Sequence, residues 1–121
     1  MKESFNKLVE MQKLNRQKCP WGKIQDLDKY ACYLKNELDE LLEAIKNNDK
    51  ENIKEEIGDL FLILTFMSAI VEEKYDLELK EIINGTIDKL EKRKPWVYGD
   101  MKLETPEEAA EMWRKLKNDF K

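Results

Sequence analysis

The feature that most restricts the fold of this chain is its shortage of residues that interrupt helices. The 121 residues include only four glycines and three prolines. Apolar residues recur at the three- and four-residue intervals typical of amphipathic helices, and no stretch shows the alternation of a strand. The connections between these periodic segments are short, which favours antiparallel packing of neighbouring helices. The pattern therefore predicts an all-α protein, an antiparallel bundle of about five helices.

The expected helices can be placed from the apolar intervals and from the residues that interrupt them. They cover approximately residues 4–16, 26 or 28 to 47, 48–74, 77–94 and 105 onward. Asn48 is expected to cap the third helix, because Glu51 follows three residues later, and Pro95 is expected to end the fourth. Residues 105–108 have the order of a capping box with proline at the first helical position. We find no internal repeat or linker, so residues 1–121 are expected to form one domain.

The charge balance and the apolar runs limit the possible partners. Charged residues make up 40% of the chain, and the net charge is -4. This balance argues against broad nonspecific binding of nucleic acid, which needs a dominant basic face. The most apolar run, residues 60–71, is too short to span a bilayer, and the N-terminal residues lack the apolar core of a secretion signal. We therefore expect a cytoplasmic protein that binds neither nucleic acid nor a membrane.

The chain contains no histidine. This absence excludes a histidine general base, the common histidine-containing zinc sites and the Glu-x-x-His pairs of di-iron bundles. Cys19 and Cys32 form neither a Cys-x-x-Cys motif nor a disulfide framework, and we expect them to be reduced structural thiols. Several common kinds of enzyme site are thus ruled out.

Two pairs of acidic residues have the spacing that places both members on one face of a helix. Glu37 and Glu40 are such a pair in the second expected helix, and Glu56 and Asp59 form another in the third. Each pair lies beside apolar residues that must be covered, whereas Glu43 faces solvent. Buried carboxylates are costly unless they are paired or bind metal. Oxygen ligands of this kind suit Mg²⁺ or Mn²⁺, although ordinary surface acids of a highly charged chain could also have this spacing.

Three segments carry motifs in a recognisable order. They read NELDE (36–40) followed by EIGD (56–59), CPWGKIQ (19–25) and KLEKRKPWVYGD (89–100). These motifs resemble the Glu-Glu-x-x-Glu…Glu-x-x-Asp, CPWD-K-x-Q and KL-x-RR-x-P-x-VFGD segments of the MazG-like nucleotide pyrophosphohydrolases, in the all-α NTP pyrophosphatase superfamily. The resemblance covers roughly residues 5–100, and EMWRKLK resembles the family's C-terminal tryptophan helix. Asn36 and Gly22 stand where the family has Glu and Asp.

The resemblance implies the reaction NTP + H₂O → NMP + pyrophosphate. The resemblance also implies that Glu37, Glu40, Glu56 and Asp59 are both the metal ligands and catalytic residues, and that they hold Mg²⁺ or Mn²⁺. A triphosphate is polyanionic, so metal ions must bridge the carboxylates to the phosphates. By family position, Lys89 and Arg93 would contact phosphate oxygens. Other candidates for substrate binding are Lys23, Lys94 and the tryptophans that could stack on the base, Trp21, Trp96 and Trp113.

The third expected helix is apolar nearly all round between residues 60 and 67. A single small domain cannot easily cover every side of such a helix. We therefore expect a homodimer or higher homo-oligomer, formed through the second and third helices. Two other interpretations stay open. One is a related all-α pyrophosphatase specific for dUTP, dCTP or phosphoribosyl-ATP, and the other is a non-catalytic helical dimerisation module whose acids form only a charged rim.

Overall fold

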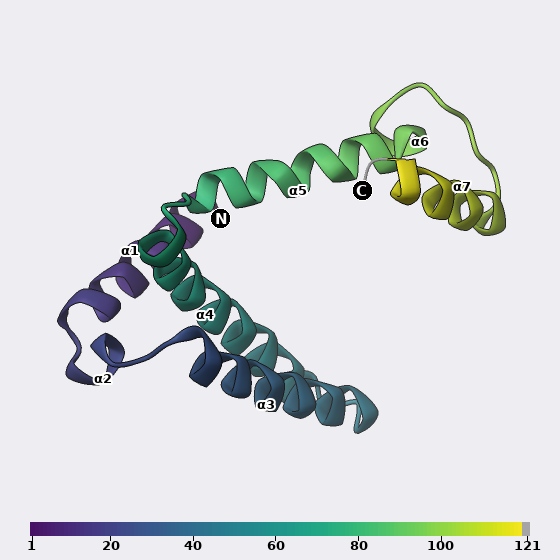
Figure 1. Cartoon of the computed structure of the whole chain (residues 1–121). Coiled ribbons are helices and arrows are strands. Elements are labelled where there is room, and N and C mark those ends of the chain that lie inside the picture. The colour runs from purple at the N-terminus through teal and green to yellow at the C-terminus, as the bar shows by residue number, and fades with distance from the viewer. Residues whose placement is uncertain (120–121) are drawn as a thin grey trace. The chain divides into compact units, whose positions relative to one another are not determined.

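The computed structural model describes residues 1–119, which form helices and no strand (Figure 1). The helices are α1 (Lys2–Lys18), α2 (Pro20–Lys23), α3 (Leu27–Lys46), α4 (Lys50–Tyr75), α5 (Leu79–Arg93), α6 (Pro95–Tyr98) and α7 (Pro106–Asp119). The all-α prediction is confirmed, and the five long helices lie where the apolar intervals placed them. Within the described part of the chain, no helix is long and apolar enough to cross a membrane.

Two short helices and one cap differ from the expectation. Pro20 and Pro95 each begin a single helical turn, α2 and α6, because proline is well tolerated at the first position of a helix. The cap of α4 is Asp49, whose carboxylate accepts from the backbone N–H of Asn52 at 3.2 Å. The prediction of Asn48 as the cap was therefore wrong by one residue. Asn48 instead has a left-handed backbone, φ 54°, which asparagine tolerates better than most residues.

The chain divides into two compact units. The N-terminal unit comprises Met1–Leu77, and the C-terminal unit begins at Glu78. The expectation of one domain over residues 1–121 stays a prediction.

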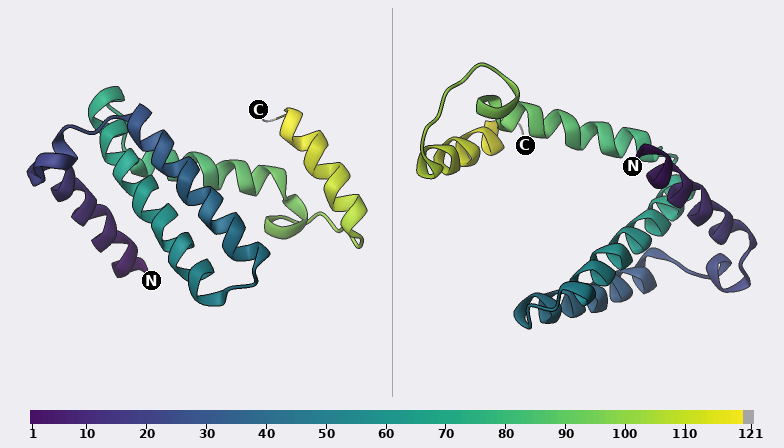
Figure 2. Two further views of the ribbon diagram at one scale, coloured as in Figure 1. Left: turned by 90° about the horizontal axis from the view of Figure 1, so that it is seen from below. Right: turned by 180° about the vertical axis from the view of Figure 1, so that it is seen from behind.

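The N-terminal unit is built on the α3–α4 hairpin, with α1 packed along α4 (Figure 2). Its core consists of Tyr30, Ile63, Phe66 and Ile70, and Phe66 is completely buried. The Tyr30 ring stacks on Phe66, with centroids 4.5 Å apart. Gln12 of α1 is also buried, and its Nε2 donates to the backbone oxygen of Leu62 at 2.7 Å. These contacts join all three long helices, so the positions of side chains on α3 and α4 are fixed relative to each other.

The C-terminal unit contains α5, α6 and α7, and α6 and α7 both contact α5. The Thr105 hydroxyl accepts from the backbone N–H of Glu108 at 3.1 Å, which satisfies a donor in the first turn of α7. No side chain described in this unit is buried. Apolar residues of α5 such as Ile82 and Ile87 are therefore exposed to solvent in the single chain.

Candidate functional site

Three of the expected acidic ligands converge between α3 and α4. Glu37 lies on α3, and Glu56 and Asp59 lie one turn apart on α4. Each offers one carboxylate oxygen, and the three oxygens lie within 4.8 Å of one another. The convergence follows from the hairpin, because antiparallel packing turns the acidic face of one helix toward that of the other. The arrangement could hold a single cation between the helices.

Glu40, the fourth expected ligand, is exposed and lies outside this group of three. It is still close enough to act on the group, because its negative charge raises the pKa of both Glu37 and Glu56. Glu43, one turn further along α3, is exposed as predicted, and its Oε1 accepts from the Asn47 amide at 3.3 Å. Glu37, Glu56 and Asp59 thus form a converging carboxylate trio, and Glu40 lies at its edge.

The trio concentrates negative charge that the described side chains do not balance. The Oε2 atoms of Glu37 and Glu56 are buried without a hydrogen-bond partner among the described residues. A hydrogen bond with the Glu56 carboxyl, burial and the charges of Glu40, Glu56 and Asp59 raise the pKa of Glu37 to about 8. The Glu37 hydrogen bond lowers the pKa of Glu56, but burial and the nearby acids outweigh it and the net shift is upward.

This charge arrangement fits a bound divalent cation. Two ionised carboxylates cannot donate to each other, so the Glu37–Glu56 contact is satisfied only by a shared proton or by a cation. The donor set consists of carboxylate oxygens, with no nitrogen or sulfur ligand in the cluster. Hard ions such as Mg²⁺ and Mn²⁺ prefer such oxygen ligands. The residues present are therefore the right kind for the metal that the sequence suggested.

An open pocket of about 380 Å³ adjoins the trio. Its lining includes Glu37 and Asp59 together with Asn15, Trp21, Tyr30, Tyr33, Leu62 and Ile63. The Trp21 ring lies 5.9 Å from that of Tyr33 and 6.1 Å from that of Tyr30, measured between centroids. Small-molecule pockets commonly combine such aromatic walls with a few polar groups. This pocket offers an aromatic surface for a planar group and carboxylates beside it for a charged one.

The predicted residue Trp21 therefore lies at the acidic site, whereas Lys23 of α2 is exposed and is not part of this lining. Tyr30 and Tyr33 were missed as pocket residues. A signal for them was present, because they precede Glu37 by seven and four residues and so share its face of α3.

The other expected substrate contacts lie in the C-terminal unit. The guanidinium carbon of Arg93 is 5.8 Å from the centroid of the Trp113 ring, and Nζ of Lys94 is 5.5 Å from it. Lys94, Trp96 and Trp113 line a hollow of about 390 Å³. Lys89 is exposed on α5. The structure thus gathers Arg93, Lys94, Trp96 and Trp113 at one end of α5, where cation–π attraction stabilises the contacts of the two cations with Trp113.

The chain is similar to known nucleotide pyrophosphohydrolases over most of its length. The model of the MazG nucleotide pyrophosphohydrolase domain matches residues 25–98. The Escherichia coli nucleoside triphosphate pyrophosphohydrolase is 32% identical over 101 residues, which are 84% of this chain and 38% of that protein. A Thermotoga maritima relative, the nucleoside triphosphate pyrophosphohydrolase/pyrophosphatase MazG, is 33% identical over 97% of this chain and 46% of its own length. The chain therefore spans less than half of each of these relatives.

A solved structure matches over nearly its whole length. The crystal structure of a mazG-related protein from Thermotoga maritima superimposes with a TM-score of 0.83 at 32% identity. The match covers 93% of this chain and 98% of the other. The two proteins therefore share one all-α fold.

Proposed function

This chain belongs to the MazG nucleotide pyrophosphohydrolase family, and on that premise we propose that it hydrolyses nucleoside triphosphates to nucleoside monophosphate and pyrophosphate. The observation that carries the proposal is the convergence of Glu37, Glu56 and Asp59 beside an aromatic pocket. A carboxylate trio suits the metal-bound phosphates of such a substrate, and the pocket suits its base. The names of the Escherichia coli and Thermotoga maritima relatives are consistent with the same reaction.

The proposed cofactor is Mg²⁺, with Mn²⁺ as an alternative. Glu37, Glu56 and Asp59 would hold it, and Glu40 at the edge of the trio would complete the ligand set. A divalent cation in such a site polarises the phosphoryl group and lowers the pKa of a bound water. The protein's part is to hold these carboxylates close together and oriented, and a cation binds them in their ionised form. Because the chain has no histidine, a carboxylate is the group best suited to accept the proton of the attacking water.

The remaining residues are assigned to the substrate. Lys89 and Arg93 would contact phosphate oxygens and stabilise the charge that develops on them during the reaction, with Lys94 and Lys23 as further candidates. Trp21 would provide a surface on which the base stacks. The indole rings of Trp96 and Trp113 are the other candidates for stacking on the base.

We also propose that the protein is a homo-oligomer joined through α3 and α4. Both helices leave large apolar side chains exposed in the single chain, namely Leu38, Leu42, Ile45, Ile57, Phe61 and Leu64. An exposed apolar surface of this extent marks an interface more often than a free face. Light scattering at micromolar concentration should give at least twice the mass of one chain, and a monomeric mass would contradict this part of the proposal.

The reaction itself is tested by its metal requirement and its products. EDTA should abolish the release of pyrophosphate, and Mg²⁺ or Mn²⁺ should restore it. Chromatography should show the monophosphate, and a diphosphate with orthophosphate would contradict the proposal. A panel of canonical and modified nucleotides, with dUTP, dCTP and phosphoribosyl-ATP included, separates the related pyrophosphatase activities. Failure with every nucleotide would favour the non-catalytic dimerisation module.

A further inference from the structure

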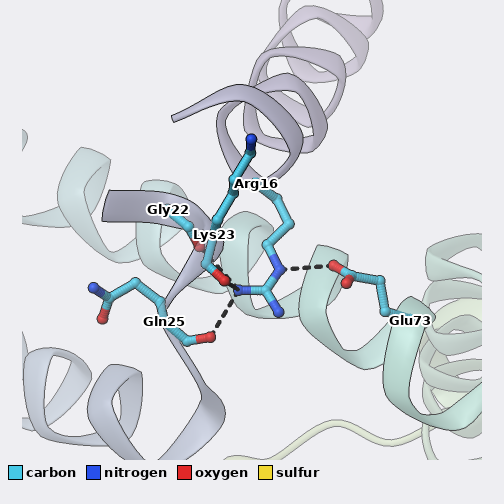
Figure 3. A network of polar contacts seen from close by, with 5 residues as sticks. All are labelled: Arg16, Gly22, Lys23, Gln25 and Glu73. Carbon is cyan, nitrogen blue, oxygen red and sulfur yellow. Dashed lines mark hydrogen bonds and ion pairs between the residues drawn. The ribbon is translucent and has the colours of Figure 1, made fainter. Parts of the chain in front are cut away.

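Arg16, near the end of α1, joins three parts of the N-terminal unit (Figure 3). Its Nε donates to Oε2 of Glu73 on α4 at 2.7 Å. Its Nη1 donates to the backbone oxygens of Gly22 at 2.9 Å and Gln25 at 2.7 Å, with a longer contact of 3.4 Å to that of Lys23. The side chain is only 17% exposed. One guanidinium therefore ties α1 and α4 to the segment of residues 19–25.

That segment depends on partners outside itself. Its only helix is α2, a single turn, and one turn of helix is not stable alone. The last carbonyls of a helix also lack partners within it and carry partial negative charge. Arg16 supplies hydrogen-bond donors to these carbonyls, and it also places a positive charge at the C-terminal end of α2. The buried Gln25 side chain adds a hydrogen bond from its Nε2 to the backbone oxygen of Trp21 at 3.1 Å.

Gly22 sets a second limit on the position of the segment. A Cβ atom at this residue would lie 2.5 Å from the backbone oxygen of Asn15 on α1. Real Cβ atoms essentially never come so close to another heavy atom, so any side chain here would push the segment away from α1. Arg16 thus holds the segment against α1 at a distance that only glycine permits.

Trp21 occupies the middle of this segment and forms one wall of the pocket beside Glu37 and Asp59. Its indole contacts Tyr30 and Tyr33 of α3 but is itself 47% exposed. Packing alone therefore does not fix the ring, and its position follows that of the backbone that carries it. We infer that Arg16 is a positioning residue that holds Trp21 in place as the wall against which the nucleobase stacks. The identity of the ligand rests on the proposed function.

Two substitutions should displace the segment of residues 19–25, one by weakening the contacts of Arg16 and the other by adding a side chain at Gly22. Arg16→Lys keeps the charge, but a compact ammonium cannot replace a planar guanidinium that donates to Glu73 and to several carbonyls at once. Gly22→Ala introduces the Cβ that collides with Asn15. Lys13→Gln is the matched control, since Lys13 makes a neighbouring ion pair to Glu72 at 3.9 Å without contacting the segment. All three variants are first compared by circular dichroism and thermal melting.

The informative readout is the division of the effect between KM and kcat. In Arg16→Lys and Gly22→Ala we expect KM for a nucleoside triphosphate to rise about tenfold, equivalent to about 1.4 kcal/mol, while kcat changes less than about threefold. Inhibition by inorganic tripolyphosphate, which has no base, should be unchanged in both variants. Lys13→Gln should match the wild type throughout. An unchanged KM, or a parallel loss of tripolyphosphate inhibition, would overturn the positioning role.

A binding measurement separates this inference from the proposed function. Isothermal titration calorimetry measures the binding of a non-hydrolysable nucleoside triphosphate to the wild type and to Arg16→Lys. Arg16→Lys should bind it about tenfold more weakly. Binding without turnover in the wild type would contradict the proposed reaction while the positioning role stands. Turnover with equal binding in the two proteins would contradict the positioning role alone.

Discussion

The two units of this chain use similar amphipathic helices with different results. In the N-terminal unit, α3 and α4 bury Tyr30, Ile63 and Phe66 against each other, and α1 adds a third layer. In the C-terminal unit, α5 also has an apolar stripe, but Ile82 and Ile87 remain 41% and 45% exposed. An apolar stripe therefore specifies a helix that needs a partner, and the partner's presence decides whether a core forms.

The units also differ in chemistry. The N-terminal unit holds the converging carboxylates and the aromatic pocket, whereas the C-terminal unit holds the expected phosphate-binding cations. A carboxylate trio needs a rigid scaffold, because its oxygens must stay within a few ångströms of one another. Lysine and arginine have long, flexible side chains, so their charged groups can reach a ligand even when the backbone that carries them is less rigidly packed. The contrast predicts that substitutions in the two units affect metal binding, stability and turnover differently.

The largest effect is expected from Asp59→Asn, which keeps the size of a trio member but removes its charge. Turnover should fall by roughly three orders of magnitude, as is typical when a catalytic unit loses one member. The metal-free melting temperature should stay level or rise, because repulsion among the acids is relieved. The stabilisation given by Mg²⁺ should largely disappear. Assays of pyrophosphate release and thermal melts with and without Mg²⁺ measure these changes.

Glu43→Gln is the control for this experiment. It lies one turn from Glu40 on the same helix but is exposed and outside the trio. It should change neither turnover nor the response to Mg²⁺. Equal damage by the two substitutions, or substantial activity in Asp59→Asn, would show that the metal face has been assigned wrongly.

The next effect concerns stability and compares the two units directly. Phe66→Ala removes a completely buried ring from the N-terminal core and should lower the free energy of unfolding by about 3–5 kcal/mol. Ile87→Ala removes a side chain that is half exposed in the single chain and should cost less than about 1 kcal/mol. Urea denaturation at two protein concentrations measures both. A large, concentration-dependent loss in Ile87→Ala would show that association covers α5.

A smaller effect is expected from the cations of α5. Arg93→Gln should lower kcat by about a hundredfold, since a group that stabilises developing charge is removed. Mg²⁺ binding should be unaffected, because Arg93 is not part of the carboxylate trio. Lys80→Gln is the control, nine residues before Lys89 and so on the opposite side of the helix at about 100° per residue. If Lys80→Gln reduced kcat as much, the assigned face of α5 would be wrong.

The smallest effect is a pH dependence of the metal-free protein. The folded-state pKa of Glu37, about 8, lies above its ordinary value of 4.5, so the folded state binds more protons between these values. The corresponding stability is fully present below about pH 4.5 and is lost as the pH rises toward 8. Because cations bind the ionised form, apparent Mg²⁺ affinity should rise by up to about tenfold per pH unit in this range and level off above it.

Thermal melts and Mg²⁺ titrations from about pH 4 to about pH 9, a range that includes both ends of this window, measure this dependence. Glu37→Gln cannot titrate, so its metal-free stability should lack this contribution. If the metal-free stability of the wild type and of Glu37→Gln changed with pH in the same way, Glu37 would be ionised throughout this range.

Much of the acidic site could be predicted because helices have a fixed period. Residues three apart share a face, so the pairs Glu37–Glu40 and Glu56–Asp59 were identifiable without a structure. The period does not give the rotation of one helix against the other, which is why Glu40 was expected among the converging acids but lies at their edge. The cap at Asp49 was missed for a similar reason, since the turn that joins α3 to α4 is set by how the two helices pack.

The amino-acid sequence by itself determined the helical class of this protein, the order of its long helices and the faces that carry the acids. These properties depend on local backbone preference and on the spacing of side chains along one helix. Only the tertiary structure decided which acids meet, how Trp21 joins them and that Arg16 pairs with Glu73. Such contacts join residues far apart in the chain, and no local period encodes the packing that brings them together.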